Sequence, residues 1–130
     1  MSTVRKDFWE DVVNLPHDRF HYTGLLSLKK LDRQTWSSWN DEKWLIEDRG
    51  YKPFHIVDGQ QRLTTLTILL SVLRSLLPET KRAVLEGAIL QKGDEILLTE
   101  DKPRLQTRPK DQQFFLRHIQ EFGGLETLFE

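Results

Sequence analysis

The sequence of 130 residues contains no cysteine, which excludes disulfide bonds, thiolate catalysis and cysteine-ligated zinc. It also has no long apolar run. The most apolar stretch, Leu63 to Leu77, is interrupted by Thr, Ser and Arg and is too short to span a bilayer. The formal net charge of −1 gives no support for a globally basic nucleic-acid-binding protein. The charged N-terminus lacks the apolar core of a signal peptide, so we expect a cytoplasmic protein without membrane contact.

Several catalytic motifs are missing as well. There is no Gly-x4-Gly-Lys-Ser/Thr loop of the Walker-type NTPases and no Gly-x-Ser-x-Gly nucleophile elbow. His17 and His21 stand four residues apart, a spacing that suits metal binding on a helix, but Pro16 disfavours a helix there. His118 is an isolated histidine on an apolar helix, without metal-ligand or general-base company. His55 lies in the strand before the Asp-Gly-Gln-Gln-Arg motif; a core or surface histidine is the favoured interpretation, and a position near its pocket is the alternative.

The remaining composition is ordinary for one small globular domain, with 38% hydrophobic and 30% charged residues. A helix is predicted from Arg5 to Leu15 and another from Lys110 to Phe122. A strand is predicted from Phe20 to Leu31. The region after Gly50 continues with alternating segments, which we interpret as a strand at Tyr51–Val57, helices at Gln60–Leu77 and Glu79–Gln91, and short strands at Glu95–Thr99 and Arg104–Thr107. This alternation indicates the α/β or α+β class.

A polar insert from Asp32 to Gly50 carries three of the four tryptophans, Trp36, Trp39 and Trp44. The favoured interpretation is a long hairpin or loop that is held in place by these aromatic side chains. The alternative is that one of them stacks on a nucleobase. The spacing of the tryptophans does not decide between the two.

The most informative stretch is Asp58–Arg62, hereafter the motif turn, between an apolar strand and a long apolar helix. Such a turn brings backbone N–H groups, the positive end of the helix dipole and the guanidinium of Arg62 into one small volume, which is how proteins build phosphate sites. Gly59 permits a backbone conformation or a close ligand approach that a side chain would block. The structural alternative has Asp58 as the helix N-cap, Gly59 in a tight turn and Arg62 in a salt bridge.

The helix after the motif turn has leucines on one stripe and further apolar residues beside it. Its thin polar edge consists of Thr64, Thr67, Ser71, Arg74 and Ser75. A helix that is apolar over most of its circumference is expected to be buried on several sides. We therefore predict that it is the core helix.

The run Ile56–Leu66, Ile-Val-Asp-Gly-Gln-Gln-Arg-Leu-Thr-Thr-Leu, resembles the signature of the DGQQR-motif family. This domain is found on the N-terminal side of GmrSD-type modification-dependent (type IV) restriction enzymes and related phage-defence proteins, in the ParB/sulfiredoxin-like superfamily. The segments Phe8–Asp11, His21–Leu26 and Pro103–Phe115 also resemble segments of that family, so the resemblance spans most of the chain.

The resemblance implies an α/β (α+β) fold of the ParB/sulfiredoxin-like type, with a small mixed sheet packed on a buried central helix over about residues 60–77. It also implies binding and hydrolysis of a nucleoside triphosphate together with a divalent cation, expected to be Mg²⁺. The implied catalytic residues are Asp58, Gln60 and Gln61. The implied nucleotide-binding residues are Asp58, Gly59, Gln60, Gln61, Arg62, Thr64 and Thr65.

In the family this activity is coupled to DNA cleavage by a separate His-Me-finger nuclease domain. The implied partners are therefore nucleotide, DNA through the full-length protein, and that nuclease domain in cis or in trans; homo-oligomers stay open. The family usually has an upstream Gln-Arg-x-Tyr-x-Trp motif, and this chain contains neither that motif nor a nuclease motif. We therefore expect a single partial domain over residues 1–130. Two alternatives remain: a ParB-like DNA-binding module, which the net charge and the lack of a basic helix disfavour, and a non-catalytic fragment.

Overall fold

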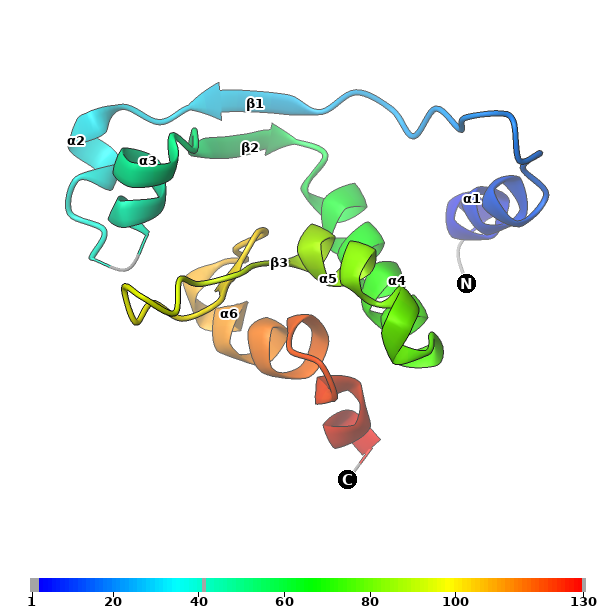
Figure 1. The fold of residues 1–130 in the computed structure, drawn as a ribbon. Coiled ribbons are helices and arrows are strands. Elements are labelled where there is room, and N and C mark those ends of the chain that lie inside the picture. The colour runs from blue at the N-terminus through cyan, green and yellow to red at the C-terminus, as the bar shows by residue number, and fades with distance from the viewer. Residues whose placement is uncertain (1–2, 41, 130) are drawn as a thin grey trace.

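The computed structural model describes residues 3–40 and 42–129 and has a mixed α/β fold (Figure 1). Its α-helices are α1 (Thr3–Val13), α2 (Arg33–Trp36), α3 (Lys43–Arg49), α4 (Gln60–Leu76), α5 (Ala83–Ile89) and α6 (Pro109–Phe115). Its strands are β1 (Ser27–Lys30), β2 (Phe54–Asp58), β3 (Leu90–Gln91) and β4 (Lys102–Pro103). Two 3₁₀ helices, η1 (Glu79–Lys81) and η3 (Gly124–Phe129), and a π-helix, η2 (Leu116–Gln120), complete the list. None of the described helices is long and apolar enough to cross a membrane.

The predicted α/β class is confirmed, but the described strands form two antiparallel pairs instead of one mixed sheet. β1 pairs with β2, and β3 pairs with β4. In the first pair Leu28 faces Ile56 while Ser27 faces Asp58, which leaves Val57 as an extra residue in β2. Such a bulge bends a strand and increases its twist. The bulge therefore lies directly before the motif turn, at the point where β2 leads into α4 (Figure 1).

The core lies where α4 packs against α5, η2 and η3. Its buried apolar side chains are Ile89, Leu90, Phe115 and Ile119, which come from α5, β3, α6 and η2. α4 ends at Leu76 because Leu77 is extended and Pro78 follows it, and proline cannot continue a helix. The predicted helix therefore has the expected position and length.

The expected burial of α4 is wrong in its details. The fully buried residues of this helix are Ser71 and Arg74, which belong to the predicted polar edge. Its apolar residues are half-buried, as are Leu66 and Leu70, or exposed, as are Leu73 and Leu76. The reason is tertiary: η2 presents backbone carbonyl groups to α4, and polar side chains are needed to donate hydrogen bonds to them.

Two predicted strand regions are also corrected. Of Phe20–Leu31, only Ser27–Lys30 is a strand, because its partner β2 has only five residues. Glu95–Thr99 is a turn, since the carboxylate of Asp94 accepts hydrogen bonds from the N–H groups of Ile96 at 2.8 Å and Leu97 at 3.1 Å. The paired strands in this region are β3 and β4, which lie before and after that turn. The strand predicted at Arg104–Thr107 is also wrong, because β4 ends at Pro103 and a bend follows it.

The polar insert forms two short helices, α2 and α3, and the predicted long hairpin or loop is wrong. Asp32 caps α2 by accepting a hydrogen bond from the N–H of Thr35 at 3.0 Å, and Gly50 ends α3 in the left-handed conformation. The three tryptophans are partly buried. Stacking of a nucleobase on one of them stays a prediction.

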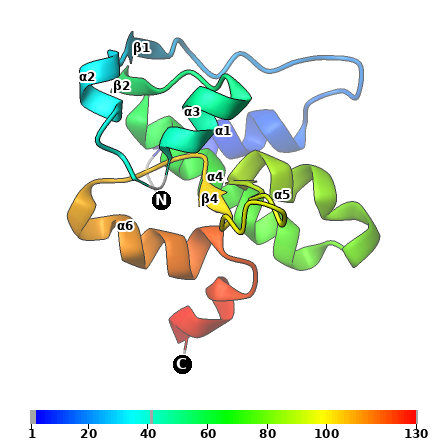
Figure 2. The ribbon, with the colours of Figure 1, turned by 60° about the vertical axis from the view of Figure 1, so that its left-hand side comes forward.

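The predicted helix at Glu79–Gln91 is split into η1 and α5, with Gln91 in β3. The predicted helix at Lys110–Phe122 continues from α6 into the π-helix η2. The N-terminal helix is confirmed at Thr3–Val13. From α1 an extended segment leads to β1 (Figures 1 and 2).

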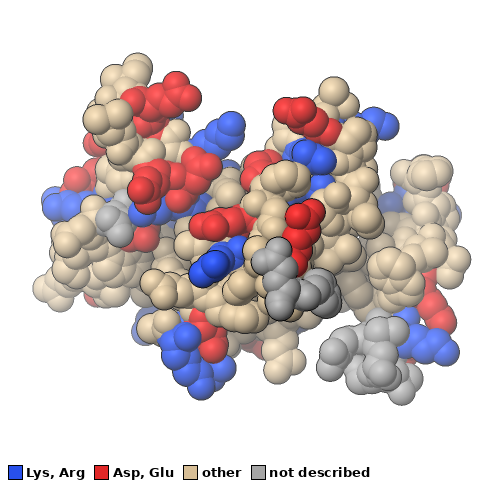
Figure 3. Space-filling view, turned by 90° about the horizontal axis from the view of Figure 1, so that it is seen from below, with Lys and Arg blue, Asp and Glu red and all other residues tan. Residues whose placement is uncertain are grey.

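The chain exposes 10407 Å² of surface for a mass of 15.4 kDa. A compact monomer of this mass exposes roughly 7,200 Å². The difference reflects an open arrangement in which large apolar side chains such as Phe20 and Val84 are more than four-fifths exposed. Charged groups cover part of the surface, and acidic and basic side chains are interspersed on the face drawn in Figure 3.

Candidate functional site

The motif turn links the end of β2 to the start of α4. Gly59 is the N-cap of α4, with φ 95° and ψ 11°, a left-handed conformation that side-chain-bearing residues rarely adopt. The side chain of Leu26 lies so close that a Cβ atom on Gly59 would be 2.7 Å from Leu26 Cδ1. The predicted tight turn at Gly59 is therefore confirmed, and both its backbone angles and its surroundings require glycine.

Two side chains hold the turn in this shape. Asp58 Oδ1 accepts a hydrogen bond from the N–H of Gly59 at 2.9 Å, and Gln60 Nε2 donates to the carbonyl of Ile56 at 2.7 Å. Asp58 therefore orders the turn without being the helix N-cap, so that part of the structural alternative is wrong. The amide oxygen of Gln60 remains available to a ligand because its hydrogen bond to β2 uses only the nitrogen.

Arg62 is fixed by contacts on two sides. Its Nη1 donates to the carbonyl of Thr23 at 3.1 Å, and its Nη2 lies 3.8 Å from Asp58 Oδ2. The salt bridge of Arg62 that the structural alternative expected is thus present, with Asp58 as its partner, but 3.8 Å is too long for a hydrogen bond. The Arg62 side chain is 41% exposed, so part of the guanidinium faces solvent beside the motif turn.

The first turn of α4 provides further donors. The first backbone hydrogen bond of this helix runs from the N–H of Leu63 to the carbonyl of Gly59 at 3.1 Å, and no side chain caps the helix. The N–H groups of Gln60, Gln61 and Arg62 precede that bond and have no acceptor within the described chain. Unpaired N–H groups at the N-terminus of a 17-residue helix favour a bound anion.

An open hollow of about 370 Å³ lies over this turn. It is lined by Val57, Asp58, Gly59, Gln60, Gln61 and Arg62. The structure therefore brings together five of the seven predicted nucleotide-binding residues, and all three predicted catalytic residues are among them. Thr64 and Thr65 are not part of the lining; the Thr64 hydroxyl donates to the carbonyl of Gln60 at 2.9 Å, and Thr65 is exposed on α4.

The described residues contain no group of three or more His, Asp or Glu side chains that could hold a metal ion by themselves. His21 packs edge-on against Phe8, with ring centroids 5.8 Å apart, and His17 is exposed. His55 lies opposite Lys29 in the β1–β2 pair and is exposed. His118 hydrogen-bonds the Thr127 hydroxyl through Nδ1 at 2.6 Å, which is a structural contact within the C-terminal segment.

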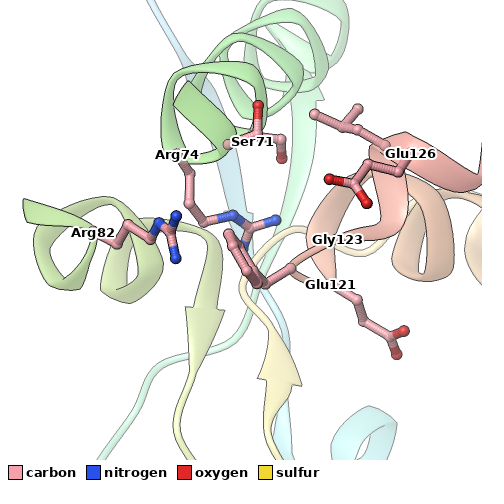
Figure 4. A pocket seen from close by; sticks show the side chains of 9 residues that line it. Ser71, Arg74, Arg82, Glu121, Gly123 and Glu126 are labelled. Atoms are coloured by element: carbon pink, nitrogen blue, oxygen red, sulfur yellow. The ribbon is translucent and has the colours of Figure 1, made fainter. Parts of the chain in front are cut away.

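A second, smaller hollow of about 100 Å³ lies where α4 meets the C-terminal segment (Figure 4). Arg74 is 1% exposed at its wall. Its guanidinium donates to the carbonyls of Gln120 at 2.7 Å and Ile119 at 3.1 Å, and to Glu86 Oε1 at 3.2 Å. Arg74 thus satisfies the carbonyl groups at the end of η2, and its charge is paired inside the protein.

Other charged and aromatic side chains line the same hollow. The guanidinium of Arg82 stacks on the ring of Phe122 at 4.4 Å from the centroid, and the carboxylates of Glu121 and Glu126 line the same hollow. Figure 4 shows Arg82 and Glu126 on opposite sides of Arg74, while the side chain of Glu121 extends away from it. Because the hydrogen bonds of Arg74 link α4 to η2, we regard this hollow as a structural clamp between α4 and the C-terminal segment.

The contact of Arg62 with Thr23 was not predicted from the sequence. The segment His21–Leu26 belongs to the predicted strand Phe20–Leu31 and resembles a segment of the family. The structure places its backbone across the motif turn. The one local signal was a glycine, Gly24, inside an apolar run, which commonly marks the close approach of another part of the chain.

A model of one protein family, described as the N-terminal domain of the GmrSD restriction endonuclease, matches residues 2–126 of the chain. The sequence matches neither a curated protein nor a solved structure. The family match covers nearly the whole chain and includes the motif turn, the segment that crosses it and the C-terminal clamp. The chain therefore belongs to the family of GmrSD restriction endonuclease N-terminal domains.

Proposed function

We propose that the motif turn binds the phosphates of a nucleoside triphosphate and promotes its hydrolysis, as a regulatory step of a DNA restriction endonuclease. One observation carries this proposal: unpaired N–H groups of the α4 N-terminus and the partly exposed guanidinium of Arg62 border the same open hollow. Both kinds of donor recognise phosphate oxygens. The hollow of about 370 Å³ lies within the usual range for small-ligand sites, about 300–1,000 Å³.

In this proposal each side chain of the motif turn has a separate role. Arg62 neutralises charge on the phosphates and binds two of their oxygens at once. Gln60 and Gln61 orient the attacking water through their amide groups. The water oxygen bonds to the γ-phosphorus, the bond from that phosphorus to the β–γ bridging oxygen breaks, and the products are a nucleoside diphosphate and inorganic phosphate. Asp58 accepts a hydrogen bond from the water or from a hydrated cation.

A divalent cation fits this arrangement as part of the nucleotide complex. Mg²⁺ keeps several of its waters and is commonly held by one or two carboxylates together with substrate phosphates. Asp58 is the carboxylate of the motif turn, and its Oδ2 points toward Arg62 at 3.8 Å. When bound, the cation supplies neutralisation of the charge that develops on the phosphate oxygens.

The test is thermal denaturation of the whole chain with each of the four nucleoside triphosphates, with and without Mg²⁺. A ligand at one hundred times its dissociation constant stabilises the folded state by about 2.7 kcal/mol, which gives an easily measured shift of the midpoint. Arg62→Ala is expected to lose most of the shift. Arg108→Ala serves as the control, because Arg108 is a largely exposed arginine that pairs locally with Asp111 on α6.

Release of inorganic phosphate is measured on the same variants. A shift without phosphate release would reduce the proposal to a nucleotide-binding regulatory site. A cooperatively unfolding chain that shows no shift with any nucleotide would contradict the proposal. Salt-dependent DNA binding that survives Arg62→Ala would instead support the ParB-like DNA-binding alternative.

A further inference from the structure

The backbone of Thr23–Leu26 crosses the motif turn and touches it at two points. A Cβ atom on Gly24 would overlap Nη1 of Arg62 and would lie 3.0 Å from its Cζ. The Leu26 side chain lies against the open side of Gly59. Gly24 itself has φ 107°, in the left-handed region that favours glycine. Two glycines from distant parts of the sequence therefore leave room for the same guanidinium and the same turn.

This contact determines the orientation of Arg62. An arginine side chain on a helix surface has many rotamers, and binding normally has to overcome the loss of that freedom. Here Nη1 is held by the Thr23 carbonyl at 3.1 Å, while Nη1 and Cζ lie where a Cβ atom on Gly24 would have to fit. The opposite edge, with Nη2, stays on the side of Asp58 and the hollow.

We infer that Gly24 is a positioning residue for Arg62. Because Gly24 has no side chain, it leaves a space, hereafter the seat, that holds the guanidinium in position for an anionic ligand at the motif turn. This inference rests on the proposed nucleotide site for its functional consequence. The seat itself is a property of the ligand-free chain. Any side chain at position 24 displaces Nη1 from the Thr23 carbonyl and turns the binding edge of Arg62 away from the hollow.

The experiment compares Gly24→Ala, Arg62→Ala and the double variant in a thermodynamic cycle. Gly50→Ala is the matched control, because Gly50 also has a positive φ, 68°, but an added Cβ there meets nothing within 4 Å. The first readout needs no ligand: it is the NMR signal of the Arg62 Nε–H group, assigned by its loss in Arg62→Ala. Gly24→Ala is expected to shift this signal, and Gly50→Ala is expected to leave it unchanged.

The second readout is the affinity for Mg-ATP and Mg-GTP. Loss of a charge-assisted hydrogen bond weakens binding by about tenfold or more, and we expect this for Gly24→Ala. The double variant should bind no more weakly than Arg62→Ala alone, because both changes remove the same contact. A purely structural role for Gly24 would instead give additive losses.

The outcomes separate the two claims. An unmoved Arg62 signal in Gly24→Ala, or additive losses in the cycle, would overturn the positioning role. If Gly24→Ala shifts the Arg62 signal but the wild-type chain binds no nucleotide, the result would support the seat and overturn the proposed nucleotide site. A shifted signal with non-additive losses supports both.

Discussion

Two arginines of α4 use the same functional group in opposite ways. The Arg62 side chain is 41% exposed at the N-terminus of the helix, and one edge of its guanidinium faces the hollow over the motif turn. The Arg74 side chain is 2% exposed, and its donors are directed at Glu86 and at the carbonyl groups of η2. Arg62 is therefore available for a ligand, whereas Arg74 holds two parts of the chain together.

Replacement of Arg74 by methionine is expected to destabilise the chain by about 3 kcal/mol, because it leaves Glu86 and the Gln120 carbonyl without their donor. The Ile119 carbonyl keeps its hydrogen bond from the Ser71 hydroxyl. Urea unfolding followed by circular dichroism measures this. Arg108→Met is the control, since the Arg108 side chain is 76% exposed and its removal should cost less than about 0.5 kcal/mol. Equal stability of the two variants would contradict the clamp.

The carboxylate of Asp94 makes stability depend on pH. Hydrogen bonds from the N–H groups of Leu97 and Ile96, and the nearby Arg49, hold the pKa of Asp94 below its ordinary value of 3.8. The folded state therefore gains stability from this group above pH 3.8, and loses it as the pH falls through the lower folded-state pKa.

Thermal midpoints of wild type and Asp94→Asn, measured between pH 2 and pH 7, test this expectation. Wild type should be the more stable protein near neutral pH, and the difference should shrink in the acid range. A difference that stays constant over the whole range would show that the Asp94 carboxylate has no lowered pKa in the folded chain.

At the scale of the elements, the junction of β2 and α4 is the critical connection. The bulge at Val57, the left-handed Gly59 and the hydrogen bond from Gln60 to Ile56 together set the angle at which the helix leaves the strand. The same junction determines where the first N–H groups of α4 point. Its geometry therefore couples the fold of this region to the proposed phosphate site.

Gly59→Ala is expected to destabilise the chain by about 1–3 kcal/mol, because alanine is strained at this φ and its Cβ would press on Leu26. Nucleotide affinity should fall with it. Gly87→Ala in α5 provides the opposite case: that glycine has open space around it, and alanine should stabilise the helix by about 0.5–1 kcal/mol. Chemical denaturation of both variants measures the change in unfolding free energy, which should be a decrease for Gly59→Ala and an increase for Gly87→Ala. A stabilised Gly59→Ala would contradict the turn geometry.

At the scale of the whole molecule, the chain is open. It exposes 10407 Å², so it buries roughly a fifth less surface than a compact monomer of its mass. The described apolar residues that remain exposed are spread over several elements, including Trp9, Leu28, Phe54 and Leu76. Stability at this scale depends on a small core around Ile89 and Phe115.

The urea dependence of the unfolding free energy follows from this openness. The slope of the unfolding free energy against urea concentration scales with the surface exposed on unfolding. It should therefore be about one fifth lower for this chain than for a compact protein of equal length. Urea titration gives the slope, and sedimentation at the same concentration checks whether the chain is monomeric. A monomer with the ordinary slope would contradict the open arrangement.

Local sequence determined the elements that depend on local physics. The motif turn, the start of α4 at Gln60 and its end before Pro78 follow from glycine, proline and apolar periodicity, and they were predictable. The convergence of Asp58, Gly59, Gln60, Gln61 and Arg62 on one hollow follows from their adjacency across a strand-to-helix turn. Such features need few distant contacts, so the residues themselves carry the information.

Tertiary structure alone decided which faces are buried and how the arginines are used. The periodicity of α4 marked Ser71 and Arg74 as a polar edge, yet they are its most buried residues because η2, nearly fifty residues later, brings carbonyl groups against them. Gly24 became the seat of Arg62 because a distant segment crosses the turn. These are pairings between remote parts of the chain, and no local pattern of side chains specifies which partner a polar group will meet.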